Sequence, residues 1–200
     1  MNIGILGAGN VGVALGTALA RAGHSVRYGM RTPTKRPDDG LTFAVAVDFA
    51  DMVVVSLPYG AIEEVLGALQ LEGRALIDTT NPMGWEEGSP VHTPPDAGSA
   101  AEQIAALTGA RVVKGFNTFG AEHCAGGTLE GRPIDVMLAS DDSDALEVAT
   151  GLCGDLGLRP IHVGPLRQAR ATEQLAVLWV QLAVVGEQGR NIAFSLLRGD

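Results

Sequence analysis

The stretch that decides the fold is residues 2–36, NIGILGAGNVGVALGTALARAGHSVRYGMRTPTKR. Its apolar start, Ile3 to Leu6, predicts a strand that leads into Gly7-Ala8-Gly9-Asn10-Val11-Gly12, which has the spacing G-x-G-x-x-G. Helical spacing of apolar residues follows from Asn10 to Gly23, and Ser25 to Tyr28 predicts a second strand. Strand, glycine turn, helix and strand in this order predict a dinucleotide-binding unit.

Each glycine of the turn has an expected role. Gly7 permits the tight turn, Gly9 lets a pyrophosphate approach the backbone, and Gly12 lets the helix pack close to the strand. The free N–H groups at the start of the helix would face the phosphates. We therefore predict that the whole turn, Gly7, Ala8, Gly9, Asn10, Val11 and Gly12, binds the cofactor. The alternative is a glycine-rich turn without a ligand, which the context disfavours.

The end of the second strand indicates which dinucleotide binds. An NAD site usually has an acidic residue there, about 20 residues beyond the glycines. This chain has Arg31 and Thr32 instead, followed by Lys35 and Arg36. The positive charge favours NADP, whose 2′-phosphate Arg31, Thr32 and Lys35 would bind. Alternatively, Lys35 and Arg36 lie on a solvated loop.

The composition bounds the class of protein. The 200 residues are 46% hydrophobic, with a mean hydropathy of +0.19, which suits one core and a modest extension. A formal net charge of −9 argues against nucleic acid or an anionic membrane as partner. The most apolar run, Leu175 to Val185, is far shorter than the roughly 20 residues of a membrane-spanning helix. Two cysteines and a chain that begins directly with a strand predict a cytoplasmic location.

The rest of the chain alternates buried-type strands with helices. Further strands are expected at 41–45, 52–56, 75–77, 111–116, 134–139 and 159–163, and helices at 62–69, 100–107 and 142–155. Barely one turn of helix is expected at 46–50, and a long loop at 83–98. This pattern predicts an α/β fold with a Rossmann-like, doubly wound parallel sheet over residues 1–163. Residues 164–200 would form a small extension, with a helix at 167–185 and a strand at 191–197.

Ligands of such sheets bind beyond the carboxyl ends of the strands. That rule collects further candidates beside the glycine turn. They are Arg31, the run Ser56-Leu57-Pro58, Asn81 and Pro82, and Asn117 and Thr118, each at or beyond the end of a predicted strand.

Several motifs in order resemble one family. They are Gly7 to Gly12, Asn81-Pro82, Val113 to Thr118, Ser140-Asp141-Asp142 and Gly164-Pro165-Leu166. Together they resemble the NADP oxidoreductase family typified by the deazaflavin (coenzyme F420) dependent NADP reductases. The nicotinamide-binding domain of the STEAP ferric reductases is similar.

The resemblance implies a homodimer that moves a hydride between NADPH and a flavin-like ring. It implies that Ala8 to Val11 hold the pyrophosphate, and that Arg31 and Lys35 hold the 2′-phosphate. By the same resemblance Leu57, Asn81, Asn117 and Ala121 line the nicotinamide end, and Arg170 helps to hold the second substrate. Position 117 has the asparagine of the STEAP-like pattern instead of the histidine of the deazaflavin reductases. Two acceptors are therefore possible: a deazaflavin, or a flavin that passes electrons to ferric iron.

No catalytic acid, base or metal site is expected. Hydride transfer between two rings depends on alignment, and the four histidines are scattered without metal-ligand spacing. We expect a small-molecule redox acceptor to bind at Trp85, Phe119, Arg167 and Arg170, although Trp85 could instead pin its loop. The apolar helix at 175–185 predicts a homodimer. A non-catalytic NADP(H) sensor is an alternative function.

Overall fold

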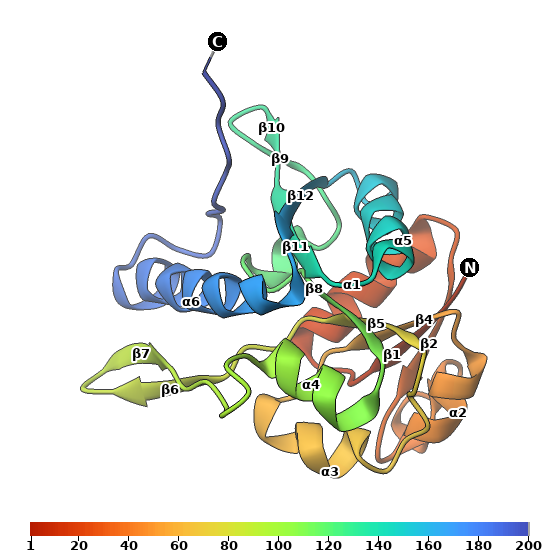
Figure 1. The fold of residues 1–200 in the computed structure, drawn as a ribbon. Helices are drawn as coiled ribbons and strands as arrows, with labels where there is room; N and C mark the ends of the chain where they lie inside the picture. Colours follow the sequence, from red (N-terminus) through yellow and green to blue (C-terminus); the bar gives the residue numbers. More distant parts are fainter. Residues whose placement is uncertain (200) are drawn as a thin grey trace.

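The computed structural model describes residues 1–199, which form an eight-stranded sheet with helices on both faces (Figure 1). The strand order is β12-β11-β8-β5-β4-β1-β2-β3. The strands are β1 (Asn2–Leu6), β2 (Ser25–Gly29), β3 (Gly40–Leu41), β4 (Met52–Val55), β5 (Ala75–Asp78), β8 (Arg111–Lys114), β11 (Asp135–Ser140) and β12 (Arg159–Gly164). The predicted Rossmann-like α/β fold is confirmed.

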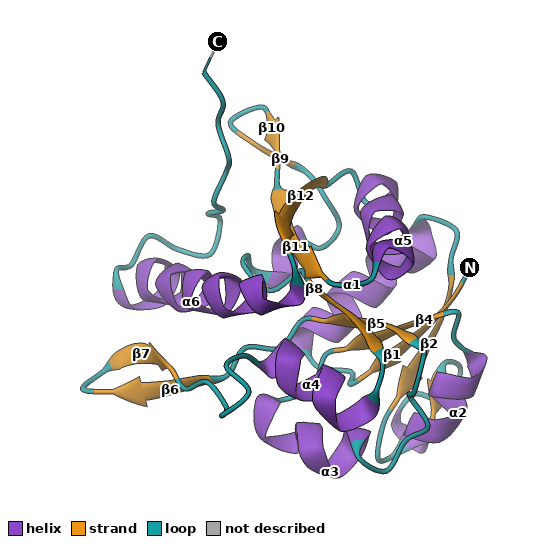
Figure 2. Ribbon diagram, in the orientation of Figure 1, coloured by secondary structure: helices purple, strands orange, loops and turns teal. Residues whose placement is uncertain are grey.

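The sheet divides the core into two layers, because successive side chains of a strand point to opposite faces. One layer packs against α1 (Asn10–Arg21) and α5 (Ser143–Asp155). The other packs against α2 (Phe43–Phe49), α3 (Ile62–Leu66) and α4 (Ala100–Thr108). Figure 2 shows the strands between these two sets of helices.

Two predicted helix starts are confirmed by their caps. Ser99 Oγ accepts a hydrogen bond from the Glu102 N–H at 3.2 Å and donates to Glu102 Oε2 at 2.7 Å, so Ser99 caps α4 and Glu102 binds the capping hydroxyl. Asp142 Oδ1 accepts from the Ala145 N–H at 2.7 Å and caps α5.

One junction of the sheet is antiparallel, which the sequence pattern did not predict. The last two residues of β11, Ala139 and Ser140, pair with Lys114 and Val113 of β8 in opposite directions. Strand β12 then pairs with β11 in parallel. Because β11 and β8 meet at their carboxyl ends, the earlier part of β11 extends beyond the carboxyl edge of the other strands (Figure 1).

The predicted strand at 41–45 is wrong. Only β3 (Gly40–Leu41) forms there, and α2 follows at once because Thr42 caps it, with Oγ1 3.4 Å from the Val45 N–H. The expected single turn at 46–50 is therefore the second half of a real crossover helix.

The expected loop at 83–98 begins as a hairpin. Strands β6 (Met83–Glu86) and β7 (Ser89–His92) are antiparallel, joined by Glu87 and Gly88. Both turn residues have positive φ, 49° and 82°, and such two-residue turns match the twist of a hairpin. A second short hairpin, β9 (Thr128–Leu129) and β10 (Arg132–Pro133), was also not predicted.

The C-terminal extension contains the expected helix. It begins with a 3₁₀ turn, η4 (Leu166–Gln168), and continues as α6 (Ala169–Val180) and a π-helical turn, η5 (Gln181–Val185). Strand β7 packs against α6, and the two form an arm beside the sheet (Figure 1). No helix within residues 1–199 has the length and apolar character needed to span a membrane.

The predicted strand at 191–197 does not form. The Leu196 N–H donates to Asp135 Oδ2 at 2.7 Å, and the Leu196 carbonyl accepts from Arg159 at 2.8 Å. Trp179 Nε1 donates to the Ile192 carbonyl at 2.9 Å. Side chains therefore satisfy this backbone, and the alternation of apolar residues is not matched by a neighbouring strand.

Candidate functional site

The glycine turn has the geometry that its sequence predicts. Gly7 has φ +108°, and a Cβ there would lie 2.3 Å from the Ser56 carbonyl oxygen. A Cβ on Gly12 would lie 2.4 Å from the Gly7 carbonyl oxygen, so α1 starts in close contact with β1. Around Gly9, in contrast, the space is open for 4 Å. The turn is thus closed toward the protein and open where a pyrophosphate would approach.

The start of α1 suits an anion. Its N-cap is Gly9, no side chain caps the helix, and the first turn has no acidic residue. The first N–H groups and the positive end of the helix dipole are therefore free to bind phosphate. Gly9 and Asn10 are exposed, while Ala8 and Val11 are half-buried beside them.

The basic residues after β2 differ in their availability. Arg31 is exposed and forms an ion pair with both oxygens of Glu64 on α3, at 3.0 and 3.1 Å. Thr32 and Lys35, at the two ends of the 3₁₀ turn η1 (Pro33–Lys35), are also exposed.

Arg36 is occupied elsewhere. It binds both oxygens of Asp39, at 2.7 and 2.8 Å, and its guanidinium lies 4.2 Å from the ring centre of Tyr28. The hydrogen bond to Asp39 raises the pKa of Arg36. Of the basic cluster, Arg31 and Lys35 are therefore the residues that face solvent.

Two asparagines meet at the carboxyl ends of β5 and β8. Asn117 Nδ2 donates to Asn81 Oδ1 at 2.9 Å and to the Thr172 carbonyl of α6 at 3.2 Å, while Asn81 Nδ2 donates to the Asn117 carbonyl at 3.1 Å. Backbone carbonyls only accept, so these contacts define the orientation of both amides. Asn117 Oδ1 is left buried and without a hydrogen-bond partner.

A buried acceptor without a partner is costly, so its presence calls for an explanation. The carboxamide N–H₂ of a nicotinamide is a donor that would satisfy it. Leu57 and Pro58 follow β4, and Pro82 follows β5, at the same edge of the sheet. Ala121 opens the 3₁₀ turn η3 (Ala121–His123) that follows β8. The predicted nicotinamide residues thus all follow neighbouring parallel strands.

The predicted acceptor residues have unequal surroundings. Trp85 is 58% exposed on the hairpin, and Arg167 is exposed on η4. Arg170 binds both oxygens of Glu102, at 2.7 and 2.8 Å, and its hydrogen bond lowers the pKa of that carboxyl. Phe119 is only 7% exposed and packs edge-on against Phe116, 6.5 Å between ring centres, so it belongs to the core.

The sequence did not predict a buried group of charged side chains close to the two asparagines. Lys114, Asp78 and Glu173 are each fully buried, and Lys114 Nζ lies 2.8 Å from Asp78 Oδ2 and 2.9 Å from Glu173 Oε1. The available signal was a lysine at the end of an otherwise buried strand, in the run Val112-Val113-Lys114.

The cysteines offer no nucleophile. Cys124 and Cys153 are free and buried, and burial raises the pKa of each thiol to about 12. Within residues 1–199, histidine, cysteine and acidic side chains form no cluster that could hold a metal ion.

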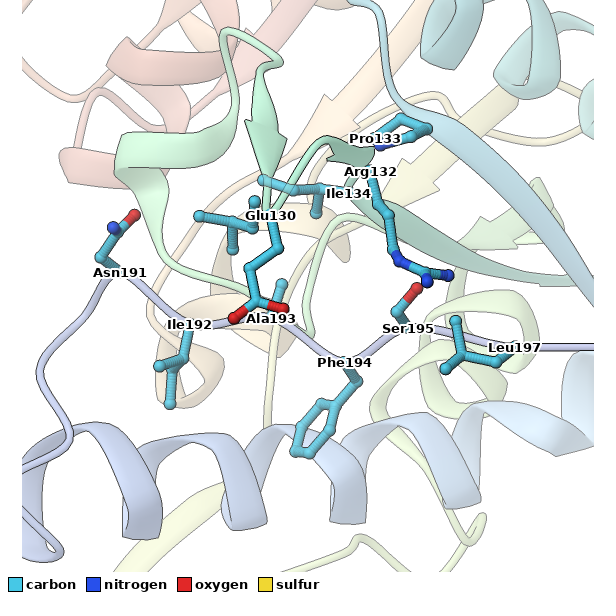
Figure 3. A pocket seen from close by; sticks show the side chains of 11 residues that line it. Glu130, Arg132, Pro133, Ile134, Asn191, Ile192, Ala193, Phe194, Ser195 and Leu197 are labelled. Carbon is cyan, nitrogen blue, oxygen red and sulfur yellow. The ribbon is translucent and has the colours of Figure 1, made fainter.

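A cavity of about 570 Å³ lies away from the glycine turn, between the β9–β10 hairpin and residues 191–197 (Figure 3). Figure 3 shows Glu130 and Arg132 on one side of it, and Asn191 to Leu197 along the other. Its lining includes none of the residues predicted to bind the cofactor.

Known proteins resemble this chain in sequence and identify its family. The family model described as NADP oxidoreductase, coenzyme F420-dependent, matches residues 2–82. The chain is 32% identical to the F420-dependent NADP reductase of Methanothermobacter marburgensis, over 92% of this chain and 93% of that protein. It is 29% identical to the metalloreductase STEAP3 of Rattus norvegicus, over 86% of this chain but 36% of that longer protein.

A solved structure is similar over the whole fold. The crystal structure of a putative F420-dependent NADP reductase from Arthrobacter sp. FB24 covers 99% of this chain and 100% of its own, with a TM-score of 0.87 and 29% identity. The chain therefore belongs to the family of coenzyme F420-dependent NADP oxidoreductases.

Proposed function

We propose that this protein is an oxidoreductase that transfers a hydride between NADP(H) and the deazaflavin coenzyme F420. The observation that carries the proposal is the 32% identity to an F420-dependent NADP reductase across nearly the full length of both chains. The geometry of the sheet edge agrees with it, because the glycine turn, the free helix start and exposed base occur together there.

The adenine end of NADP(H) would be held by two groups of residues. The turn from Gly7 to Gly12 would bind the pyrophosphate through N–H groups and the dipole of α1. Arg31, Thr32 and Lys35 would bind the 2′-phosphate, for which Arg31 must exchange its present partner, Glu64. Because both side chains are largely exposed, Arg31 can leave Glu64 without any rearrangement of the core.

The nicotinamide end would be held by Asn81 and Asn117, with Leu57, Pro58, Pro82 and Ala121 around it. Support comes from Asn117 Oδ1, a buried acceptor that lacks a donor in the protein. The dinucleotide supplies the hydride, and the residues of the chain supply alignment of the ring. No side chain is assigned as a catalytic acid or base, because hydride transfer between two rings requires none.

The acceptor would bind beside the arm. Trp85 offers an exposed aromatic face, and Arg167 offers positive charge to an anionic tail. Arg170 would contribute only by leaving Glu102, and Phe119 would support the site from the core. The acceptor is a small-molecule redox compound.

We also propose that the protein is a homodimer. Trp85, Leu178, Leu182, Val184 and Val185 are all exposed, and all lie on the hairpin or on the last turns of the long helix. Large exposed apolar surfaces mark interfaces. The long helix of the arm would then belong to the extension, residues 164–200, that closes the NADP-binding domain, residues 1–163. Two free buried thiols agree with a cytoplasmic location.

Light scattering tests the dimer at micromolar concentration. The double variant Leu178→Glu, Val184→Glu should shift the mass to that of a monomer, because it places charge in the apolar surface. A monomer in the unmutated protein would refute the proposal.

The function is tested by an anaerobic assay that follows NADPH absorbance against F420, FMN, riboflavin, a quinone and a ferric chelate, with and without EDTA. Oxidation of NADPH by F420 alone supports the proposal. Ferric reduction that requires flavin would indicate a STEAP-like reductase instead. Tight NADPH binding without turnover of any acceptor would indicate a non-catalytic NADP(H) sensor.

A further inference from the structure

The strongest unassigned feature is the buried group of Asp78, Lys114, Glu173 and His92, here called the charge cluster. Lys114 Nζ contacts Asp78 Oδ2 at 2.8 Å, Glu173 Oε1 at 2.9 Å and the Thr80 carbonyl. Glu173 Oε1 also accepts from the first N–H of α4, that of Ala100, at 3.0 Å. His92 Nε2 lies 3.2 Å from Glu173 Oε2. The charge cluster therefore joins β5, β8, α4, α6 and the hairpin.

Three charged side chains of this group are fully buried, and His92 adds a fourth polar member. Asp78 and Glu173 bring two negative charges and Lys114 brings one positive charge, all at 0% exposure. His92, at 13% exposure, is the remaining partner of Glu173. A carboxylate only accepts, so His92 Nε2 is the donor of this hydrogen bond.

The charge cluster contacts the segments that carry the two asparagines. Lys114 holds the Thr80 carbonyl, one residue before Asn81, and is itself three residues before Asn117. Glu173 follows Thr172, whose carbonyl accepts from Asn117 Nδ2 at 3.2 Å. Asp78 Oδ1 accepts from the Thr80 N–H at 2.8 Å. The hydrogen bonds of the two asparagines involve only Asn81, Asn117 and Thr172. Each of these residues is within three positions of a member of the charge cluster in the sequence.

Stability alone does not explain such a group. Replacing a buried ion pair by well-packed apolar residues is often neutral or stabilising. Fully hydrogen-bonded buried networks instead specify one arrangement of their surroundings. Hydride transfer depends on such an arrangement, because small displacements of a bound ring cost large factors in rate.

We propose that Lys114 and Glu173 are positioning residues, which hold Asn81 and Asn117 so that the Asn117 carboxamide faces the nicotinamide. His92 binds Glu173 and so ties the hairpin to the same group. The inference rests on the proposed use of NADP(H). It assigns no contact between the charge cluster and the reacting atoms.

The test compares two ligands. Adenosine 2′,5′-bisphosphate reaches only the adenine end, whereas NADPH reaches both ends, so a positioning role affects only the second. Their affinities are measured by calorimetry in Glu173→Ala, in Glu173→Gln and in Lys114→Met, together with kcat for F420 and the melting temperature. Glu147→Ala, which removes an exposed carboxylate on α5, is the matched control.

We expect Glu173→Ala to bind adenosine 2′,5′-bisphosphate within about twofold of the unmutated protein, while kcat falls by about tenfold or more and NADPH affinity falls by roughly fivefold. Glu173→Gln keeps an acceptor for Lys114 and Ala100, so it should recover most of both losses. Glu147→Ala should change neither. Lys114→Met leaves two buried carboxylates without their cation, and if it does not fold, the two Glu173 variants decide.

Unchanged NADPH affinity and kcat in Glu173→Ala would overturn the inference. An equal loss of both ligands would overturn it too, because that result describes general unfolding. If the unmutated protein binds NADPH but does not reduce F420, the proposed function fails. The affinities of the variants for NADPH and for adenosine 2′,5′-bisphosphate then still test the positioning role.

Discussion

The two ends of the candidate site are built in different ways. The adenine end comes from one continuous stretch, residues 2–36, in which a strand, a turn and a helix each depend on near neighbours. The nicotinamide end is assembled from β5, β8 and α6, and its contacts join residues 36, 55 and 59 positions apart. Local pattern therefore specifies the first end, and packing specifies the second.

Substitution of Gly7, in the locally specified adenine end, should have the largest effect on stability and binding. Gly7→Ala forces a side chain to φ +108° and places Cβ 2.3 Å from the Ser56 carbonyl oxygen, so strain and overlap add. We expect the free energy of unfolding to fall by about 2–5 kcal/mol, with loss of NADPH binding. Urea denaturation measures it.

Gly9→Ala is the matched control for that change. Gly9 has φ −79°, which alanine tolerates, and open space around it. Stability should change by less than about 1 kcal/mol, while NADPH affinity falls because the backbone is no longer free to approach the pyrophosphate. If both variants were equally stable, the different roles assigned to the two glycines would be wrong.

Arg31→Ala should have the next largest effect. We expect NADPH to bind the unmutated protein better than NADH by a charge-assisted contact of roughly 1.5–3 kcal/mol, about ten- to hundredfold, and the variant to lose most of that preference. Titration of both nucleotides by tryptophan fluorescence measures it. Arg36→Ala is the control, because Arg36 is already bound to Asp39. Equal affinity of the unmutated protein for NADPH and NADH would exclude the NADP assignment.

Most of the fold could be predicted because its signals are local. Periodicity located the strands of the main sheet apart from β3, and the caps at Ser99 and Asp142 located two helix starts. Besides the β9–β10 hairpin and the absent strand at 191–197, three features were not predicted. Thr42 caps a helix inside a run that also suits a strand. Glu87-Gly88 makes a common type of hairpin turn, but glutamate is an uncommon residue at its first, positive-φ position. The direction of β11 depends on which strand it meets, and no local pattern records that.

The candidate site was predictable only as a set of positions. Asn81 and Asn117 were expected at one edge because strands of a parallel sheet end together, and they do meet. Their pairing with Thr172 and the charge cluster involves α6, and periodicity does not say where a terminal helix docks. The local sequence does not show that Arg36 binds Asp39 instead of a phosphate. It also does not show that Phe119 is buried in the core instead of exposed to a ligand.

A substitution of Trp85 tests whether the hairpin contributes to the acceptor site beside the nicotinamide end. If it stacks on the acceptor, Trp85→Ala should raise the KM for F420 by roughly two- to tenfold, the worth of an aromatic contact, and leave NADPH affinity intact. Steady-state kinetics with each substrate varied in turn separates the two. An unchanged KM would remove the hairpin from the acceptor site and leave Trp85 as part of the apolar surface alone.

The smallest predicted effect concerns Glu64, which binds Arg31 where a 2′-phosphate would bind. Because the side chains of this pair are 65% and 73% exposed, it contributes only about 0.2–1 kcal/mol. Glu64→Gln should therefore tighten NADPH binding by at most about fivefold and leave NADH unchanged. The gain should vanish near 1 M salt, where charges are screened within roughly 3 Å. Glu63→Gln is the matched control, since the neighbouring carboxylate binds Gln103 at 2.8 Å instead. Equal gains in the two variants would mean that the net charge of α3, and not competition for Arg31, weakens binding.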